Sequence, residues 1–409
     1  MIKNLWDWFR IKYSKIINSI AFIPAFIAIL FLALSALMIL FDYSETGKQL
    51  KEDIGWLSLK DASTARSIIQ AIVTGIISLA VFSFSMVMIV LNQAASYLSN
   101  RVLDKLIGNR FQQLILGIYL GTIVYGLALL TTRRDIDSGI YVPALSTYFL
   151  IILTVVDIFL FIYFLHYITQ SVKYETIIDR ICMQTKHTIE KKCTLREEPD
   201  EPEKLMNGKL ILSPRSGVYE GFHEKYLLDF CKQHNIVISL LHTPGTFLIM
   251  DTPLITIQGK NDLDENFIKQ LLTHVHITNN ETIEANYLYG FRQLMEIAVK
   301  GLSPGQNDPG TAVEALRAIS DLLHFRINLF PHNSYKDDNG IARILAKQKS
   351  FNEIFNDTLL PIWDYGKNDR ILQKELLNIL KQLKVSNNSA VEQLFSEVQM
   401  HLAEYKLRH

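Results

Sequence analysis

Cysteine is scarce in this chain of 409 residues, and the three that occur, Cys182, Cys193 and Cys231, form no CxxC pair. Such an odd, sparse set predicts neither a disulfide framework nor a structural zinc site, and it favours a reducing compartment. Net charge is also absent, because 41 basic residues balance 41 acidic ones, so we expect no nucleic-acid partner. The sequence shows no phosphate-binding loop and no serine–histidine or cysteine–histidine constellation. We therefore expect neither an enzyme nor a cofactor.

What the chain does contain is a set of long apolar spans, all within the first 168 residues. About 20 apolar residues, each rising about 1.5 Å along a helix, cross a hydrocarbon core of about 30 Å. Four spans meet this length, at about 21–41, 67–91, 114–130 and 144–168. The sequence thus predicts a four-helix transmembrane domain over 21–168, followed by one large domain on one side of the membrane.

Basic residues are distributed unequally between the two sides. The N-terminus, the loop after the second span and the stretch from Lys173 to Lys186 carry ten Lys and Arg, whereas the other two loops carry six. This bias predicts that both termini and the large C-terminal domain are cytoplasmic. Residues 1–20, with Trp6 and Trp8 among lysines, are interpreted as an amphipathic interfacial segment or as a helical start to the first span.

Small and polar residues recur at helical spacing along one face of the second span. After Ala71 and Gly75 this stripe continues through Ser78, Phe82, Ser85, Ile89, Asn92 and Ser96. One interpretation is close helix packing, because small residues let backbones approach. The other is the wall of a water-filled pore in an oligomer, with Phe82 and Ile89 as apolar constrictions. The first and third spans are expected to face mainly lipid.

The fourth span contains two ionisable residues. Asp157 lies near its middle, where an acid costs a few kcal/mol on insertion scales. We expect it to be an ion or proton ligand, part of a gate, or the hydrogen-bond partner of a neighbouring hydroxyl. His166 lies near the cytoplasmic end of the span and is interpreted as an interfacial packing residue or, alternatively, as a proton-binding residue.

The rest of the chain has the pattern of an α+β region. Its expected parts are a helical stalk and linker, a small β-barrel or sandwich-like module, and a mostly helical domain, at 169–205, 206–278 and 279–409. Residues 244–254 are expected to form a hairpin similar to that of biotinyl and lipoyl domains. No lysine occupies the modification position, so no covalent cofactor is predicted. His274 and His276 alternate on an expected strand, but without a recognisable third ligand they predict no metal site.

A turn-rich motif separates two expected helices of the C-terminal domain. A helix over about 282–300 is expected to end there, and Asp308 is placed to cap a new helix that has Pro309 at its first position. Because a carboxylate already occupies the helix start, we interpret the motif as a structural elbow rather than an anion site. The elbow residues are Ser303, Pro304, Asn307, Asp308, Pro309 and Thr311.

Several of these segments together resemble one known family. They are Ser78–Ser85 with Gln93, Leu116–Tyr125, Phe164–His166, and the elbow sequences Leu302-Ser303-Pro304, Asn307-Asp308-Pro309 and Thr311-Ala312. The combination is similar to the bacterial domain-of-unknown-function family numbered 2254, a family of predicted membrane proteins. The resemblance implies a bacterial inner-membrane location and no established activity.

Two functional hypotheses follow. The leading one is a homo-oligomeric channel or pore-like transport protein for ions, lined by the second span and regulated by the cytoplasmic domain. The alternative is a membrane-anchored scaffold or sensor whose cytoplasmic domain binds a protein or small ligand, without transport. The alternative expects Ser78, Ser85 and Asn92 to be buried between helices of one protomer. The expected partners are therefore the lipid bilayer and, for the first hypothesis, further copies of the chain and ions.

Overall fold

The computed structural model describes residues 21–53, 62–97, 110–131, 143–171, 173–195, 208–260, 263–279, 281–383 and 388–408. The chain divides into two compact units, of which the N-terminal unit ends at Lys173 and the C-terminal unit begins at Tyr174. The interfacial segment predicted for 1–20, and the portion of the predicted linker at 196–205, lie outside the described residues.

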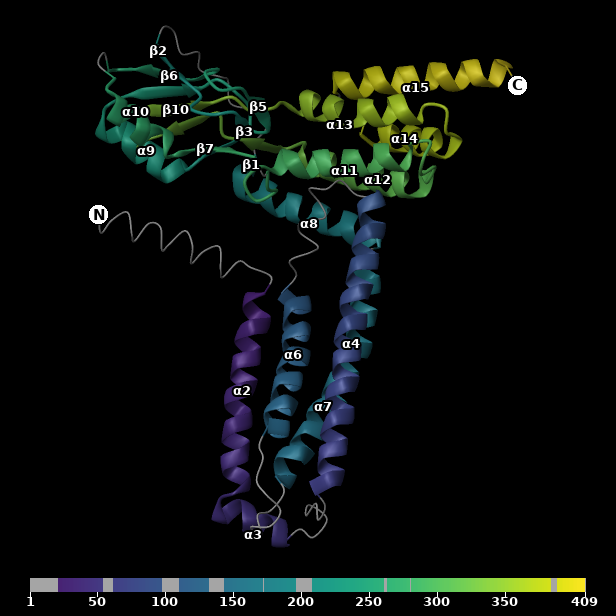
Figure 1. The fold of residues 1–409 in the computed structure, drawn as a ribbon. Helices are drawn as coiled ribbons and strands as arrows, with labels where there is room; N and C mark the ends of the chain where they lie inside the picture. Colours follow the sequence, from purple (N-terminus) through teal and green to yellow (C-terminus); the bar gives the residue numbers. More distant parts are fainter. Residues whose placement is uncertain are drawn as a thin grey trace. The chain divides into compact units, whose positions relative to one another are not determined.

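Long apolar helices form the N-terminal unit (Figure 1). Its described helices are α2 (Phe22–Asp42), α3 (Glu45–Asp53), α4 (Ala62–Tyr97), α6 (Arg110–Thr131) and α7 (Ala144–Ser171). Among the described residues, α2, α4, α6 and α7 are the helices long and apolar enough to cross a membrane. These four helices confirm the four predicted spans, with bounds that differ by a few residues.

Glycines make α6 the helix against which its neighbours pack. A Cβ atom added at Gly121 would lie 2.7 Å from the ring of Phe31 on α2, and one added at Gly126 would lie 2.5 Å from Cγ2 of Val73 on α4. Small residues allow this close approach between helices. The expectation that the third span faces mainly lipid was therefore wrong, because half of α6 is buried inside the unit. Hydropathy alone does not report which apolar helix is central.

The C-terminal unit combines helices with short strands. Its helices are α8 (Tyr174–Lys192), α9 (Glu224–Gln233), α10 (Glu265–Leu272), α11 (Tyr287–Gly301), α12 (Pro309–Arg326), α13 (Phe351–Gly366), α14 (Arg370–Leu383) and α15 (Ser389–Arg408). Its strands are β1 (Cys193–Leu195), β2 (Lys209–Leu212), β3 (Gly217–Phe222), β4 (Val237–Leu240), β5 (Thr246–Leu248), β6 (Pro253–Gln258), β7 (Val275–Thr278), β8 (Leu329–Pro331), β9 (Ser334–Lys336) and β10 (Ala342–Ala346).

The described strands form separate sheets rather than a closed barrel. The orders are β2-β6-β4-β10-β9, β5-β3-β7 and β1-β8. Strands β4 and β10 pair in parallel, and the other pairings are antiparallel. Both larger sheets, together with α9 and α10, contribute to one apolar core that includes Leu227, Ile238, Ile255 and Leu271. The region is α+β, as predicted, but its barrel-like closure is not observed.

The hairpin predicted for 244–254 is not formed. Strand β5 pairs with β3, whereas β6 pairs with β2 and β4, so the chain passes here from one sheet to the other. Asp251 lies at this crossing with φ of 66°, and its backbone N–H donates to the carbonyl of Ser213 at 3.0 Å. Strand β10 comes from the part expected to be helical, and it aligns Ile344 with Ile238. Such distant pairing leaves no local sequence signal.

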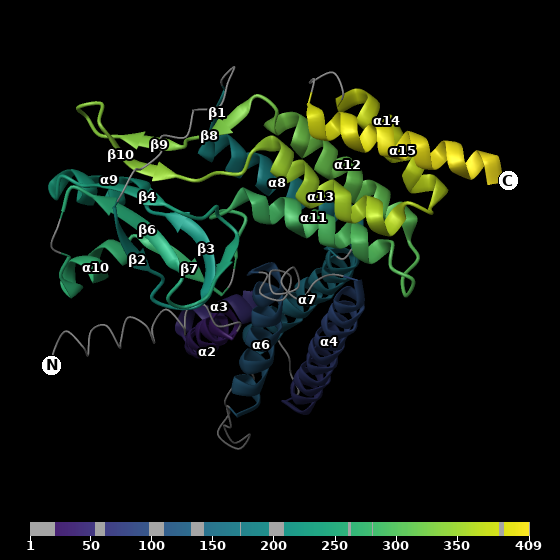
Figure 2. The ribbon, with the colours of Figure 1, turned by 90° about the horizontal axis from the view of Figure 1, so that it is seen from above.

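Helices α8 and α11–α15 gather beside the sheets (Figure 2). The helical stretch predicted after the fourth span is divided, because α7 ends at Ser171 and α8 belongs to the C-terminal unit. Helix α8 packs closely on α11, because a Cβ atom added at Gly290 would overlap Oγ1 of Thr185. At the far end of this layer, Nε1 of Trp363 on α13 donates to Glu397 of α15 at 2.8 Å.

Candidate functional site

The polar stripe predicted on the second span lies on the surface of the single chain. Its described members are all exposed, namely Ser78, Phe82, Ser85, Ile89 and Asn92. The hydroxyls of Ser78 and Ser85 donate to the carbonyls of Thr74 and Val81 at 3.0 and 2.9 Å. The scaffold hypothesis expected these residues to be buried between helices of one protomer, and they are not. The side chain of Ser96 lies outside the described side chains.

The opposite face of α4 packs into the unit. It is apolar along its length, through Ile69, Val73, Ile76, Val87 and Val90, with one hydroxyl among them. That hydroxyl belongs to Ser83, which is fully buried. Ser83 is not among the predicted site residues, although its spacing from Ile76 and Val90 places it on this apolar helical face.

Asp157 is fully buried in the middle of α7, and two hydroxyl-bearing residues of α6 lie near it. Thr122 of α6 lies beside its carboxyl group, Tyr119 of α6 interacts with it electrostatically, and Ser83 of α4 lies beside Tyr119. None of these contacts reaches hydrogen-bond geometry within the described residues. Asp157 thus has neighbours that the sequence did not identify.

A second buried acid, Asp42, lies where the end of α2 meets the start of α7. It is the last residue of α2, and its carboxylate accepts hydrogen bonds from the backbone N–H groups of Leu145 and Ser146 at 3.2 and 2.7 Å. The Ser146 hydroxyl donates a third bond at 2.5 Å, and the Tyr125 hydroxyl donates to the Ser146 carbonyl. An anion placed at the first turn of α7 satisfies N–H groups that have no intrahelical partner. Asp42 therefore has a structural role.

The remaining predicted residues of the fourth span and the elbow have clear positions. His166 is exposed on α7. At the elbow, α11 ends at Gly301, whose carbonyl accepts from the Asp308 N–H at 2.8 Å. Asp308 then caps α12 by accepting from the Thr311 N–H at 3.1 Å and from its hydroxyl at 2.6 Å, with Pro309 at the helix start.

The other elbow residues complete a tight turn. Asn307 has φ of 46°, its N–H donates to the Ser303 carbonyl at 2.9 Å, and the Ser303 hydroxyl donates to the carbonyl of Lys300. Pro304 is exposed at the outside of the turn. Backbone and capping bonds account for these polar groups, as expected of a structural elbow.

A histidine cluster lies where β7 meets α9. The rings of His223 and His276 are 4.2 Å apart between centroids, and His274 also interacts with His223. Burial, followed by the neighbouring His223, lowers the pKa of His274 and of His276 below the ordinary value. Among the described residues, no group of three His, Cys, Asp or Glu side chains has a geometry that would hold a metal ion.

The three cysteines are free thiols in the C-terminal unit. Burial raises the pKa of Cys231 to about 12 and also raises the pKa of Cys193. Because the thiolate is the reactive form, these two buried thiols are poor nucleophiles at neutral pH.

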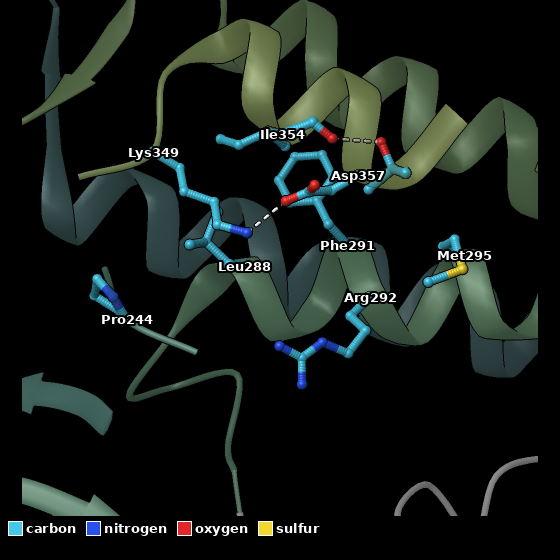
Figure 3. A pocket seen from close by; sticks show the side chains of 9 residues that line it. Pro244, Leu288, Phe291, Arg292, Met295, Lys349, Ile354 and Asp357 are labelled. Atoms are coloured by element: carbon cyan, nitrogen blue, oxygen red, sulfur yellow. Dashed lines mark hydrogen bonds and ion pairs between the residues drawn. The ribbon is translucent and has the colours of Figure 1, made fainter. Parts of the chain in front are cut away.

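A cavity of about 210 Å³ lies between α11 and α13, next to the loop that carries Pro244 (Figure 3). Its floor is apolar and formed by Leu288, Phe291 and Ile354, and its rim carries Arg292, Lys349 and Asp357. Lys349 pairs with Asp357, while Arg292 donates to Glu281 at 2.7 Å and to the carbonyl of Gly245 at 3.1 Å. Each rim charge thus already has a partner of opposite charge, so the rim is close to neutral.

The chain is similar to proteins of mycobacteria. It is 25% identical over 331 residues to uncharacterized proteins of Mycobacterium tuberculosis strain H37Rv and of Mycobacterium bovis, covering 77% of this chain. The chain spans 63% of the length of those relatives. No solved structure matches it. The model of a family described as predicted membrane proteins, DUF2254, matches residues 17–382, so the chain belongs to the DUF2254 family.

Proposed function

We propose that this protein is a homo-oligomeric channel or pore-like transport protein of the bacterial inner membrane, with a cytoplasmic C-terminal unit that regulates it. The observation that carries the proposal is the stripe on α4, because its small and polar residues are exposed in the part of the chain that the structure describes. Polar side chains at membrane depth ordinarily face protein or a water-filled cavity rather than acyl chains. Further copies of the chain would provide both.

The chemistry of the stripe suits a narrow pathway. The hydroxyls of Ser78 and Ser85 each donate to their own helix, which leaves the lone pairs of both oxygens available to water or a cation. Phe82 and Ile89 lie between these polar positions and would form apolar constrictions of the kind that gate by dewetting. The bias of Lys and Arg between the loops supports the cytoplasmic orientation.

Cysteine accessibility combined with conductance tests this proposal. Ser78→Cys and Ser85→Cys variants of the full chain, reconstituted in planar bilayers, are treated with a water-soluble thiol reagent. We expect both to react and the modification to change the conductance. Phe84→Cys is the matched control, because Phe84 is 57% exposed on α4 but lies off the stripe. Absence of conductance, with the two stripe cysteines as unreactive as the control, would contradict a pore.

A sensor or scaffold without transport is the second candidate, and the cavity between α11 and α13 favours it. Its apolar floor and paired rim charges suit a small ligand with an apolar body and polar ends. The test is the thermal midpoint of the full chain in the presence of a panel of small amphipathic acids and amines. A ligand-dependent rise that is lost in Phe291→Ala, in protein that conducts no ions, would favour the sensor over the channel.

A further inference from the structure

The centre of the N-terminal unit holds five oxygen atoms that have no hydrogen-bond partner among the described residues. They are Ser83 Oγ, Tyr119 Oη, Thr122 Oγ1 and both carboxyl oxygens of Asp157. The four side chains are between 0% and 1% exposed, so neither bulk water nor lipid reaches them. Buried polar groups without partners are rare in native proteins, and each needs an explanation.

These oxygens come from three helices, and each side chain lies near at least one of the others. Thr122 lies beside the Asp157 carboxyl group, and Tyr119 interacts with both Asp157 and Ser83. Asp157 is the fourteenth residue of α7, which spans 28 residues, so the cluster lies at mid-depth. Because α4, α6 and α7 each contribute, the arrangement depends on the tertiary packing of a single chain and requires no second copy.

Apolar residues enclose the cluster toward both ends of the bundle. One apolar cluster contains Ile69, Val73, Tyr125, Leu129 and Leu150, and the other contains Ile76, Val87, Ile115, Phe164 and Ile168. No Lys, Arg or His among the described residues forms an ion pair with Asp157. An ionised carboxylate in such surroundings costs several kcal/mol unless a positive charge accompanies it. An ionised Asp157 would therefore need a counter-charge that no described residue supplies.

We propose that Ser83, Tyr119, Thr122 and Asp157 bind one monovalent alkali cation inside the N-terminal unit. Oxygen is the ligand that hard cations prefer, and all five atoms are oxygens. One carboxylate neutralises one positive charge, so a monovalent ion leaves the low-dielectric site neutral, whereas a divalent ion would leave an uncompensated charge. A cation also engages several oxygens at once, whereas a proton on Asp157 would engage only the carboxyl group and one neighbour.

This cation site is independent of the proposed pore. The pore requires further copies of the chain arranged around the α4 stripe, whereas the cation site lies on the opposite face of α4 and is complete within one chain. A protein that conducts nothing would still bind the ion, and a pore would still form if the site were empty. An experiment that contradicts one of the two proposals therefore leaves the other standing.

Carbodiimide labelling of Asp157 tests the site directly. Dicyclohexylcarbodiimide reacts with a protonated carboxyl group in apolar surroundings and leaves a stable N-acylurea, which mass spectrometry locates. The full chain is labelled in choline chloride and again with added NaCl or KCl at constant ionic strength. At a cation concentration about ten times the Kd, the unoccupied fraction falls about tenfold, and we expect labelling to fall equally.

Ligand variants connect the protection to this cluster. Ser83→Ala and Thr122→Val retain the Asp157 carboxyl group but remove oxygen ligands, so labelling should become independent of the cation. Thr74→Val is the matched control, because it makes the same chemical change as Thr122→Val at an exposed position of α4 outside the stripe and the cluster, and it should keep the protection. If Thr122→Val is not monodisperse in detergent, the test relies on Ser83→Ala, which is the less disruptive substitution.

Two outcomes would overturn the proposal. One is Asp157 labelling that is equal in choline, Na⁺ and K⁺ and changes only with pH, which would make the group a proton site. The other is protection by an alkali cation that survives both ligand variants, which would place the ion elsewhere in the protein.

Discussion

Asp42 and Asp157 are two acids of the same helical unit, both 0% exposed, and they differ in what the chain provides for them. Asp42 receives three hydrogen bonds from Leu145 and Ser146 at the start of α7. Asp157 lies in the middle of the same helix, where the backbone N–H groups are already used within the helix, and no described side chain completes a bond to it. A helix end can satisfy an anion, whereas a helix middle cannot.

The same contrast holds for small residues. At Gly121 of α6 the Phe31 ring occupies the space that a Cβ atom would need. At Gly75 of α4 no atom lies within 4 Å of the position of a Cβ atom. Positions that the chain satisfies by itself contribute to folding. Positions that it leaves open are available to ions, lipid or another copy.

Asp42→Ala should have the largest effect. It leaves two buried N–H groups at the start of α7 without an acceptor, so we expect a loss of about 2–3 kcal/mol in the free energy of unfolding. Thermal unfolding of the full chain in detergent measures the loss. Ser67→Ala is the control, because Ser67 is exposed on α4 and its hydroxyl donates to the Ser63 carbonyl of its own helix. A loss no larger than that of the control would show that Asp42 does not cap α7.

Gly121→Ala should have the next largest effect, because the added methyl group would overlap the Phe31 ring. We expect a loss of about 1–2 kcal/mol from this overpacking. Gly75→Ala should be neutral, or should stabilise α4 by up to about 1 kcal/mol through helix propensity. The comparison uses the same assay on monomeric detergent-solubilised protein. Equal losses in the two variants would mean that α4 is packed as closely as α6.

Asp157→Asn should change stability far less than Asp42→Ala. The amide has nearly the same shape as the carboxyl group, and no hydrogen bond is lost, so in cation-free buffer we expect a change within about 0.5 kcal/mol. Adding NaCl should then raise the unfolding midpoint of the wild type but not that of the variant. If the variant unfolds as readily as Asp42→Ala, the carboxylate has a structural partner.

The smallest effect concerns pH and the C-terminal unit. The pKa values of His274 and His276 are lowered by burial and then by His223, so the folded state disfavours their protonation. Because the unfolded chain then binds more protons than the folded chain, acid favours unfolding. The free energy of unfolding keeps its full value above the unfolded pKa of about 6.5 and decreases as the pH falls below it.

Hydrogen exchange of residues 208–279 in the full chain, followed from neutral to mildly acidic pH, measures the slope of stability against pH. His276→Gln should flatten it, whereas His166→Gln, on the exposed surface of α7, should not. An unchanged slope in His276→Gln would exclude the cluster as its source. The effect of Lys192 acts on protonation of His276 and is lost with it, so any residual pH dependence in that variant would come from His274.

Local patterns predicted much of the architecture. The four spans follow from runs of apolar residues, and the elbow follows from Asp308 and Pro309, whose capping and helix-start preferences act within a few residues. The α+β character of the C-terminal region was also predictable from short apolar runs between turns. The pairing of β5 with β3, rather than with β6, was not, because either partner satisfies the same local pattern.

By itself the sequence determined that four helices are apolar enough to cross a membrane, that an acid interrupts the fourth, and where α11 stops and α12 restarts. Only the tertiary structure decided that α6 is central, that the α4 stripe faces outward while Ser83 faces inward, and that Asp42 caps α7. The physical reason is that hydropathy and capping are properties of consecutive residues. Which helix faces meet depends on close packing between segments far apart in the chain. That packing also brings Thr122 and Tyr119 near Asp157, and Ser83 beside Tyr119.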